Sequence, residues 1–340
     1  MKSFIKTHYY MFILILIELL VLCMLVSVCC GHYSISVKAS LNILFSTLVG
    51  QNNYLGSMDS TIIFGLRLPR IIGAILVGAA LSLSGATYQS IFQNPLVSPD
   101  ILGASSGACV GAALGILLHF PKSIIVLLSF IAGTITVALT TIIPKILKST
   151  SNIMLVLSGI ITGGIMDSIL GMIKYVADPQ SELPQITYWA MGALDNVTYR
   201  ELLISMLPIT VCIFLLFRIS WWIDILSFGE IDARIIGADT KKIRLISIIS
   251  STLLTAIAVC LCGTIGWIGL VIPHFARMLV GAENSRIFPA SALLGSIFLI
   301  IVDTLARTIV DVEVPLSIIT GLAGAPFYAW LLYLQRKRLN

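Results

Sequence analysis

The chain has 340 residues, of which 58% are hydrophobic and only 11% are charged, and its mean hydropathy is +1.02. Soluble domains carry about 25% charged residues, so this chain has too few charges to cover a surface that faces water. The net charge of +5 comes from basic residues scattered between apolar runs, a pattern that argues against nucleic-acid binding. The runs are continuous, which predicts helices in lipid and excludes the alternating pattern of barrel strands.

The apolar runs predict about ten transmembrane helices in one domain, residues 1–340, because a span needs about 20 apolar residues. The expected fold class is therefore an all-α integral membrane protein. The eighth run is too short to cross alone, so we expect a half-helix packed inside the bundle. The expected spans are residues 9–30, 62–91, 101–119, 123–146, 153–176, 201–220, 243–265, 268–280, 288–306 and 315–334.

The basic residues between the spans indicate the topology. If the amino terminus lies inside, about two thirds of the 21 Lys and Arg residues fall on the inner side, as the positive-inside rule requires. This placement predicts that both termini are cytoplasmic. The first run is longer than the apolar part of a signal peptide, so we interpret it as a span.

Two arginines stand at the outer start of the second span, in the sequence Arg67-Leu68-Pro69-Arg70. They oppose the positive-inside trend, which leaves two explanations: lipid headgroup anchoring, or docking of an acidic partner outside. Arg307 is expected at the same face, at the end of the ninth span, and favours docking. Such charges set mainly the rate and orientation of binding, and salt weakens them.

Two short connections on the inner side carry polar residues. Residues 93–100 form a turn with two prolines that contains Asn94 and Leu96, and it is either a plain turn or part of a gate. Ser149 and Thr150 precede the fifth span, where such side chains are typical helix N-caps.

Glycines recur every fourth residue on one face of the third span, at Gly103, Gly107, Gly111 and Gly115. Without side chains on that face, a neighbouring helix can approach closely. The alternative to packing alone is a smooth wall beside a transport path.

Two carboxylates are assigned to spans, Glu18 and Asp167. Each costs about 2.5–3.5 kcal/mol at the middle of a membrane on insertion scales. Glu18 is therefore expected to face protein or to reach the membrane edge, and Asp167 is expected to face a helix partner. A role for Asp167 in a transport path is left open.

The inner stretch of residues 221–242 contains a short amphipathic segment, Gly229-Glu230-Ile231-Asp232-Ala233-Arg234-Ile235-Ile236-Gly237. The segment is too short to span, and its glycines bracket one or two helical turns. It is expected either to lie in the groove of a partner protein or to rest on lipid headgroups. Further on, residues 263–274 combine Gly, Pro and His within an apolar stretch, which predicts a broken helix.

Together these motifs resemble the FecCD-type permeases of type II ABC importers, the family of siderophore, haem and cobalamin permeases. The resemblance covers residues from about 60 to the carboxyl terminus. It is carried by RLPR (67–70), LSGATYQSIFQNPLVSPDILGASSGA (83–108), YWAMG (188–192), GEIDARIIG (229–237), GTIGWIGLVIPHFAR (263–277), DTLAR (303–307) and LAGAPFYAWLL (322–332).

The resemblance implies a cobalamin-permease-like bundle of ten spans that pairs as a dimer in a prokaryotic plasma membrane. It further implies two ATP-binding cassette subunits inside, a substrate-binding protein outside, and a substrate path along the dimer interface. By residue, it implies ATPase coupling by Gly229, Glu230, Asp232, Ala233, Arg234 and Gly237, docking by Arg67, Arg70 and Arg307, and cytoplasmic gates at Asn94, Leu96, Ser149 and Thr150.

The motifs that are missing from the sequence agree with this interpretation. There is no GxxxxGKS/T sequence and no HExxH sequence, so the chain is expected to be a transport subunit without catalytic residues, bound metal or cofactor. ATP and Mg²⁺ are expected to act in the separate ATPase. A secondary transporter driven by an ion gradient is the alternative, and it requires carboxylates along its path.

The resemblance suggests a ferric siderophore as substrate, and it leaves haem, cobalamin and molybdate open. A homodimer is expected, with a sister permease as the alternative.

Overall fold

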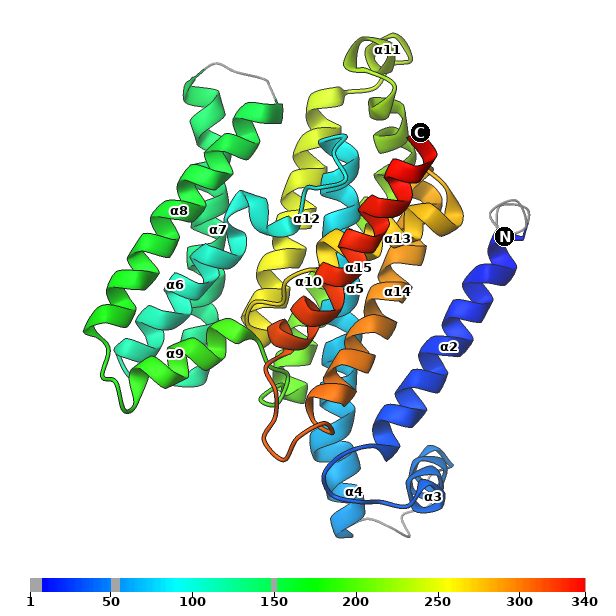
Figure 1. The fold of residues 1–340 in the computed structure, drawn as a ribbon, viewed down its shortest axis with the longest axis vertical. Helices are drawn as coiled ribbons and strands as arrows, with labels where there is room; N and C mark the ends of the chain where they lie inside the picture. The colour runs from blue at the N-terminus through cyan, green and yellow to red at the C-terminus, as the bar shows by residue number, and fades with distance from the viewer. Residues whose placement is uncertain (1–7, 50–55, 148–151, 340) are drawn as a thin grey trace.

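The computed structural model describes residues 8–49, 56–147 and 152–339, and within these ranges the chain is helical without strands. The helices pack as a bundle whose long members run roughly along one direction (Figure 1). In chain order they are α2 (Tyr9–Cys29), α3 (Val37–Leu48), α4 (Met58–Ile62), a π-helical turn (Ile63–Arg67), α5 (Leu68–Ile91), a 3-10 turn (Pro99–Leu102), α6 (Ala104–Leu117), α7 (Lys122–Ile146), α8 (Asn152–Val176), α9 (Glu182–Met191), α10 (Tyr199–Ser227), α11 (Glu230–Ile235), α12 (Thr240–Cys262), α13 (Ile268–Val280), α14 (Asn284–Ala306) and α15 (Leu316–Leu339).

The predicted spans correspond to helices of the bundle. By length and composition, the described residues contain 7 helices able to cross a membrane, and three shorter apolar helices lie in α6, α13 and α15. The prediction of an all-α membrane protein with about ten apolar helices is therefore confirmed. Residues 263–267 are not helical and separate α12 from α13, as the broken-helix interpretation predicted.

The two ends of the bundle differ. In Figure 1, α11 lies at one end, where α2 begins and α15 finishes, and α4 lies at the other. We call these the α11 end and the α4 end. The sequence prediction missed α3 and α9, two short helices outside the main spans, and it ended α10 at residue 220 although that helix continues to Ser227.

Helix α5 lies at the centre of the bundle, in contact with α10, α12, α13 and α14. Small residues permit this close packing. A Cβ atom on Gly78 would overlap the backbone of Gly295 in α14, and a Cβ atom on Gly85 would overlap the carbonyl group of Gly269 in α13. The backbones of α5 and its neighbours therefore touch directly at these crossings.

This packing predicts that Gly85→Ala lowers the thermal stability of the detergent-solubilised chain. The new methyl group has no space unless α5 and α13 separate, and overpacking of this kind costs about 1–3 kcal/mol. Gly171→Ala is the matched control, because Gly171 is also helical and has open space around it. Since alanine favours helix formation, the control should melt at the same temperature as the wild type or higher. Equal melting of the two variants would contradict the close crossing.

Candidate functional site

The first candidate site is α11, the short helix at the α11 end. Gly229 precedes it with φ +129° and Gly237 follows it with φ +90°, a backbone region that glycine adopts without strain. The backbone N–H of Ala238 donates to the carbonyl oxygen of Ala233 at 2.9 Å, which closes the helix. The Ala233 side chain is fully buried, whereas Asp232 and Arg234 are exposed. The sequence therefore closes α11 as a short helix between α10 and α12.

Helix α11 exposes an apolar surface. Ile231 is 77% exposed, Ile235 78% and the preceding Phe228 77%, and Ile236 beside them is also exposed. These four residues define what we call the α11 apolar edge. Helix α11 lies beyond the long helices at one end of the molecule (Figure 1). Exposed apolar patches with charged neighbours are typical of surfaces that contact a partner.

The loop that contains Asn94 and Leu96 lies at the same end and is tied to the base of α11. The side-chain oxygen of Asn94 accepts a hydrogen bond from the Leu96 N–H at 2.9 Å, which fixes the turn and leaves Leu96 exposed. The Gln93 amide donates to the carbonyl oxygens of Leu226 and Ser227, both at 3.3 Å, in the last turn of α10. Gln93 thus links the loop to the helix that leads into α11, a contact that the sequence prediction missed. Ser149 and Thr150 lie outside the described residues.

A buried polar network continues inward from the same end. Asp224 of α10 accepts hydrogen bonds from the backbone and side-chain nitrogens of Asn284, both at 2.8 Å. Asn284 in turn accepts from the Ser90 hydroxyl at 2.5 Å, and Arg277 donates to that hydroxyl at 3.0 Å. The network joins α10, α14, α5 and α13. Sequence reasoning missed it because its members are distant along the chain.

The glycine stripe of α6 lies against α7. Cβ atoms on Gly107 and Gly111 would overlap Thr136 and Leu128 of α7, and Gly115 lies beside Ile125. Gly103 precedes the helix with φ +75° and forms its cap. In the described structure this face is occupied by helix packing, and a role beside a transport path stays a prediction.

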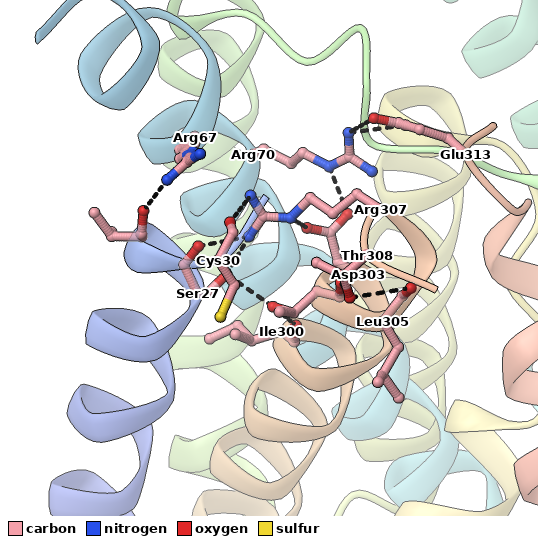
Figure 2. A network of polar contacts seen from close by, with 12 residues as sticks. Ser27, Cys30, Arg67, Arg70, Ile300, Asp303, Leu305, Arg307, Thr308 and Glu313 are labelled. Atoms are coloured by element: carbon pink, nitrogen blue, oxygen red, sulfur yellow. Dashed lines mark hydrogen bonds and ion pairs between the residues drawn. The ribbon is translucent and has the colours of Figure 1, made fainter. Parts of the chain in front are cut away.

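The three predicted docking arginines meet at the α4 end, where all three side chains are buried (Figure 2). Arg67 donates to the carbonyl oxygens of Val28 at 2.6 Å and Tyr33 at 2.5 Å. Arg307 donates to the carbonyl oxygen of Ser27 at 2.8 Å and that of Cys30 at 3.1 Å. The carbonyls at the end of α2 have no partners within that helix, so the two guanidinium groups satisfy them and hold α2 in place.

Arg70 is bound by two carboxylates that the sequence prediction missed. Its Nε lies 2.6 Å from Asp303 Oδ1, and its Nη1 lies 2.8 Å from Glu313 Oε1. Asp303 also lies 3.4 Å from Arg307, four residues along α14. The Asp303 side chain is 1% exposed and that of Glu313 is 31% exposed. The i, i+4 spacing within DTLAR was the available sequence signal for the Asp303–Arg307 pair.

These residues surround a hollow of about 290 Å³ at the α4 end, lined by the three arginines together with Asp195, Glu313 and residues 31–33. The arginines therefore share one site, which agrees with their predicted common face. Their guanidinium groups are bonded within the chain in this structure, a feature that the sequence did not predict. Docking of a partner at this hollow stays a prediction.

The assignment of only two carboxylates to spans was wrong, because Asp303 lies inside α14 and Asp224 lies inside α10. Both are held by polar partners, whereas Glu18 and Asp167 are exposed on α2 and α8.

Among the described residues no group of His, Cys, Asp or Glu has the arrangement of a metal site, and the seven cysteines are free.

Several known proteins resemble this chain in sequence. The sequence model of the FecCD transport family matches residues 19–334. The molybdate import system permease protein MolB of Haemophilus influenzae is 36% identical over 323 residues, covering 95% of each chain. A Helicobacter pylori protein named "Probable iron chelatin transport system permease protein" is 38% identical over 285 residues, 84% of this chain and 86% of its own. The hemin transport system permease protein HmuU of Yersinia pestis is 36% identical over 281 residues, 80% of this chain and 83% of its own.

Two solved structures resemble this chain in fold. One, described as "An inward-facing conformation of a putative metal-chelate type ABC transporter", has a TM-score of 0.86 and 35% identity, covering 96% of this chain and 99% of its own. PsaBC from Streptococcus pneumoniae, at 17% identity and a TM-score of 0.55 over 84% of this chain and 94% of its own, shares the fold. The chain therefore belongs to the FecCD transport family, and it is the permease subunit of an ABC importer for metal chelates, haem, vitamin B12 or molybdate.

Proposed function

We propose that the chain is the membrane subunit of an ATP-driven importer of ferric siderophores, with separate ATPase subunits attached at the α11 end. The observation that carries the attachment of separate ATPase subunits is the α11 apolar edge, which a short helix presents beyond the spans. A lipid-facing surface needs no such projection, whereas a helix laid into a partner's groove does. Gln93 would pass a movement of α11 to the gate loop that contains Asn94 and Leu96. In this proposal the α11 end and both termini lie in the cytoplasm of a prokaryotic cell.

The exposed face of α8 supports assembly as a dimer, which we propose to be a homodimer. Ile153, Ile160, Ile165 and Met172 are all more than half exposed along this face. Gly164 lies on the same helix with open space around it, where a second helix can approach. Asp167 would then lie near the path between the two subunits.

At the α4 end we propose docking of an acidic substrate-binding protein over the arginine hollow. Glu313 pairs with Arg70 and is partly exposed, so it occupies the place that a partner's carboxylate would take. An incoming carboxylate would displace Glu313 and keep Arg70 paired. Asp303 is buried and would keep its contact throughout.

This competition predicts that Glu313→Gln strengthens docking of the binding protein by about 1.4-fold to fivefold at low salt, since an exposed ion pair contributes about 0.2–1 kcal/mol and one carboxylate is removed. Asp311→Asn is the matched control, because Asp311 is an exposed acid two residues away and changes the net charge equally. Binding of the separately purified partner to the solubilised complex measures both variants. Equal effects of the two substitutions, or weaker binding after Glu313→Gln, would refute the competition.

Molybdate is the second candidate substrate, because the Haemophilus influenzae relative that covers 95% of this chain is a molybdate permease. Uptake of radioactive iron as a siderophore complex and of radioactive molybdate should be compared in cells with and without the chain. Loss of siderophore uptake on deletion supports the proposal, and loss of molybdate uptake alone replaces it with the second candidate.

The same cells separate the importer from a secondary transporter. ATP-driven import should stop when ATP is depleted and should survive a protonophore while ATP is maintained. The opposite result would contradict ATP coupling, and Asp167 would then be the carboxylate to replace first.

A further inference from the structure

A long apolar groove lies between α7 and α12, in the half of the bundle that includes the α11 end. Its volume is about 730 Å³, and its walls are mainly apolar, with Val137, Ala138 and Leu155 on one side and Leu245, Ile249 and Leu253 on the other. It belongs to neither the α11 apolar edge nor the arginine hollow. Nothing in the proposed transport mechanism uses it.

The groove has the length of a lipid acyl chain. Its lining residues extend from Thr134 to Lys145 on α7 and from Lys241 to Leu253 on α12. At 1.5 Å per residue these stretches are about 16–18 Å long, and they run along the helices. Ile135, Leu139 and Ile142 on α7 are exposed beside the groove, as expected of a surface that faces lipid. The groove is therefore open to the bilayer along its side.

Basic side chains gather at the end of the groove nearest α11. Lys145 lies in the last turn of α7, and Lys241 and Arg244 lie in the first turns of α12. No carboxylate lines the groove among the described residues. Asp239, the nearest acid along α12, caps that helix by accepting a hydrogen bond from the Lys242 N–H at 3.1 Å. This basic end, which we call the mouth, therefore has an excess of positive charge. It adjoins the apolar part of the groove, which we call the trough.

We propose that this groove binds an anionic glycerophospholipid, with the phosphate headgroup at Lys145, Lys241 and Arg244 and one acyl chain along the apolar trough. Basic pockets between transmembrane helices at the cytoplasmic side are suited to anionic headgroups. A soluble anion would satisfy the mouth and leave the trough unfilled, and a zwitterionic lipid would fill the trough without neutralising the mouth. The bound lipid braces α7 against α12, the helix that follows α11.

The test uses the full-length chain, purified in mild detergent and observed intact by native mass spectrometry. It is titrated with phosphatidylglycerol or with phosphatidylcholine of the same acyl composition. The wild type should bind phosphatidylglycerol at least about 25-fold more tightly, since each basic group near a membrane surface contributes about 1 kcal/mol toward an anionic headgroup. Lys145→Gln combined with Lys241→Gln should weaken phosphatidylglycerol binding by about 25-fold and leave phosphatidylcholine binding unchanged.

Arg218→Gln combined with Lys242→Gln is the matched control, because both side chains are exposed and neither lines the groove. It removes the same charge and should leave the affinity within about twofold of the wild type. Ala138→Phe tests the trough separately, since the ring would fill the groove while every basic group stays. It should weaken the binding of both lipids.

Three outcomes would overturn the proposal. Equal affinity of the wild type for the two lipids would remove the role of the basic mouth. Equal losses in the groove variant and the control variant would show a general charge effect. Competition by glycerol phosphate as strong as that by the whole lipid, with Ala138→Phe unchanged, would show a site for free phosphate.

Discussion

Asp303→Ala is expected to destabilise the chain by about 3–5 kcal/mol, because it removes one partner from a buried ion network. Asp303 is buried between Arg70 at 2.6 Å and Arg307 at 3.4 Å. Without this carboxylate, two guanidinium groups would share a buried site with Glu313 alone. Arg307 also holds the end of α2 through Ser27 and Cys30, so we expect α2 to loosen as well.

Thermal unfolding of the detergent-solubilised chain measures this effect, and the melting temperature should fall by roughly 5–15 °C. Asp303→Asn should fall between the wild type and Asp303→Ala, because the amide keeps an acceptor for Arg70 and loses the charge. Asp311→Ala is the control for loss of an acidic residue at the same end, since Asp311 is exposed. If Asp303→Ala melts with the control, the network does not stabilise the fold.

The second large effect is expected from Ile231→Asp combined with Ile235→Asp in α11. Both side chains are exposed in the free chain, at 77% and 78%, so the substitutions should leave its folding intact. In the proposed complex both are buried in the ATPase groove, where each isoleucine contributes about 1.5–3 kcal/mol. Association with the ATPase should therefore weaken at least about 100-fold, and ATP-driven uptake should be lost.

Ile309→Asp combined with Val312→Asp is the matched control, because these residues are equally apolar and exposed at 62% and 79%, and they lie near the α4 end. Pull-down of the ATPase with each tagged variant gives the comparison, and uptake by the α11 variant is compared with uptake by the wild type. An α11 variant that binds the ATPase like the control and transports like the wild type would show that α11 rests on lipid headgroups and contacts no ATPase.

The sequence predicted the helices well where an apolar run was long. The expected span 123–146 corresponds to α7 at Lys122–Ile146, and 9–30 corresponds to α2 at Tyr9–Cys29. It failed where helix formation does not depend on an apolar run. Helix α10 begins at a Thr198–Glu201 capping box and continues through Trp221 and Asp224. These two residues are polar enough to end an apolar run in the sequence, but they do not end the helix. Helix α9 was missed for the same reason.

The candidate sites were predictable as positions along the chain and not as networks. The glycines around α11 were visible as a local pattern, and the common face of the three arginines followed from the order of the predicted spans. The partners of the arginines were not visible. The carbonyl groups at the end of α2 belong to the backbone and leave no sequence signal, and Glu313 is 243 residues from Arg70. The Asp224–Asn284 contact likewise depends on packing between distant helices.

Co-purification of the tagged chain from its native membrane in gentle detergent tests the central claim most directly. We predict that an ATPase with a Walker motif accompanies the chain and that Arg234→Glu, at the exposed side of α11, releases it. A chain that purifies without any ATPase, from cells whose uptake is insensitive to ATP depletion, would contradict the claim.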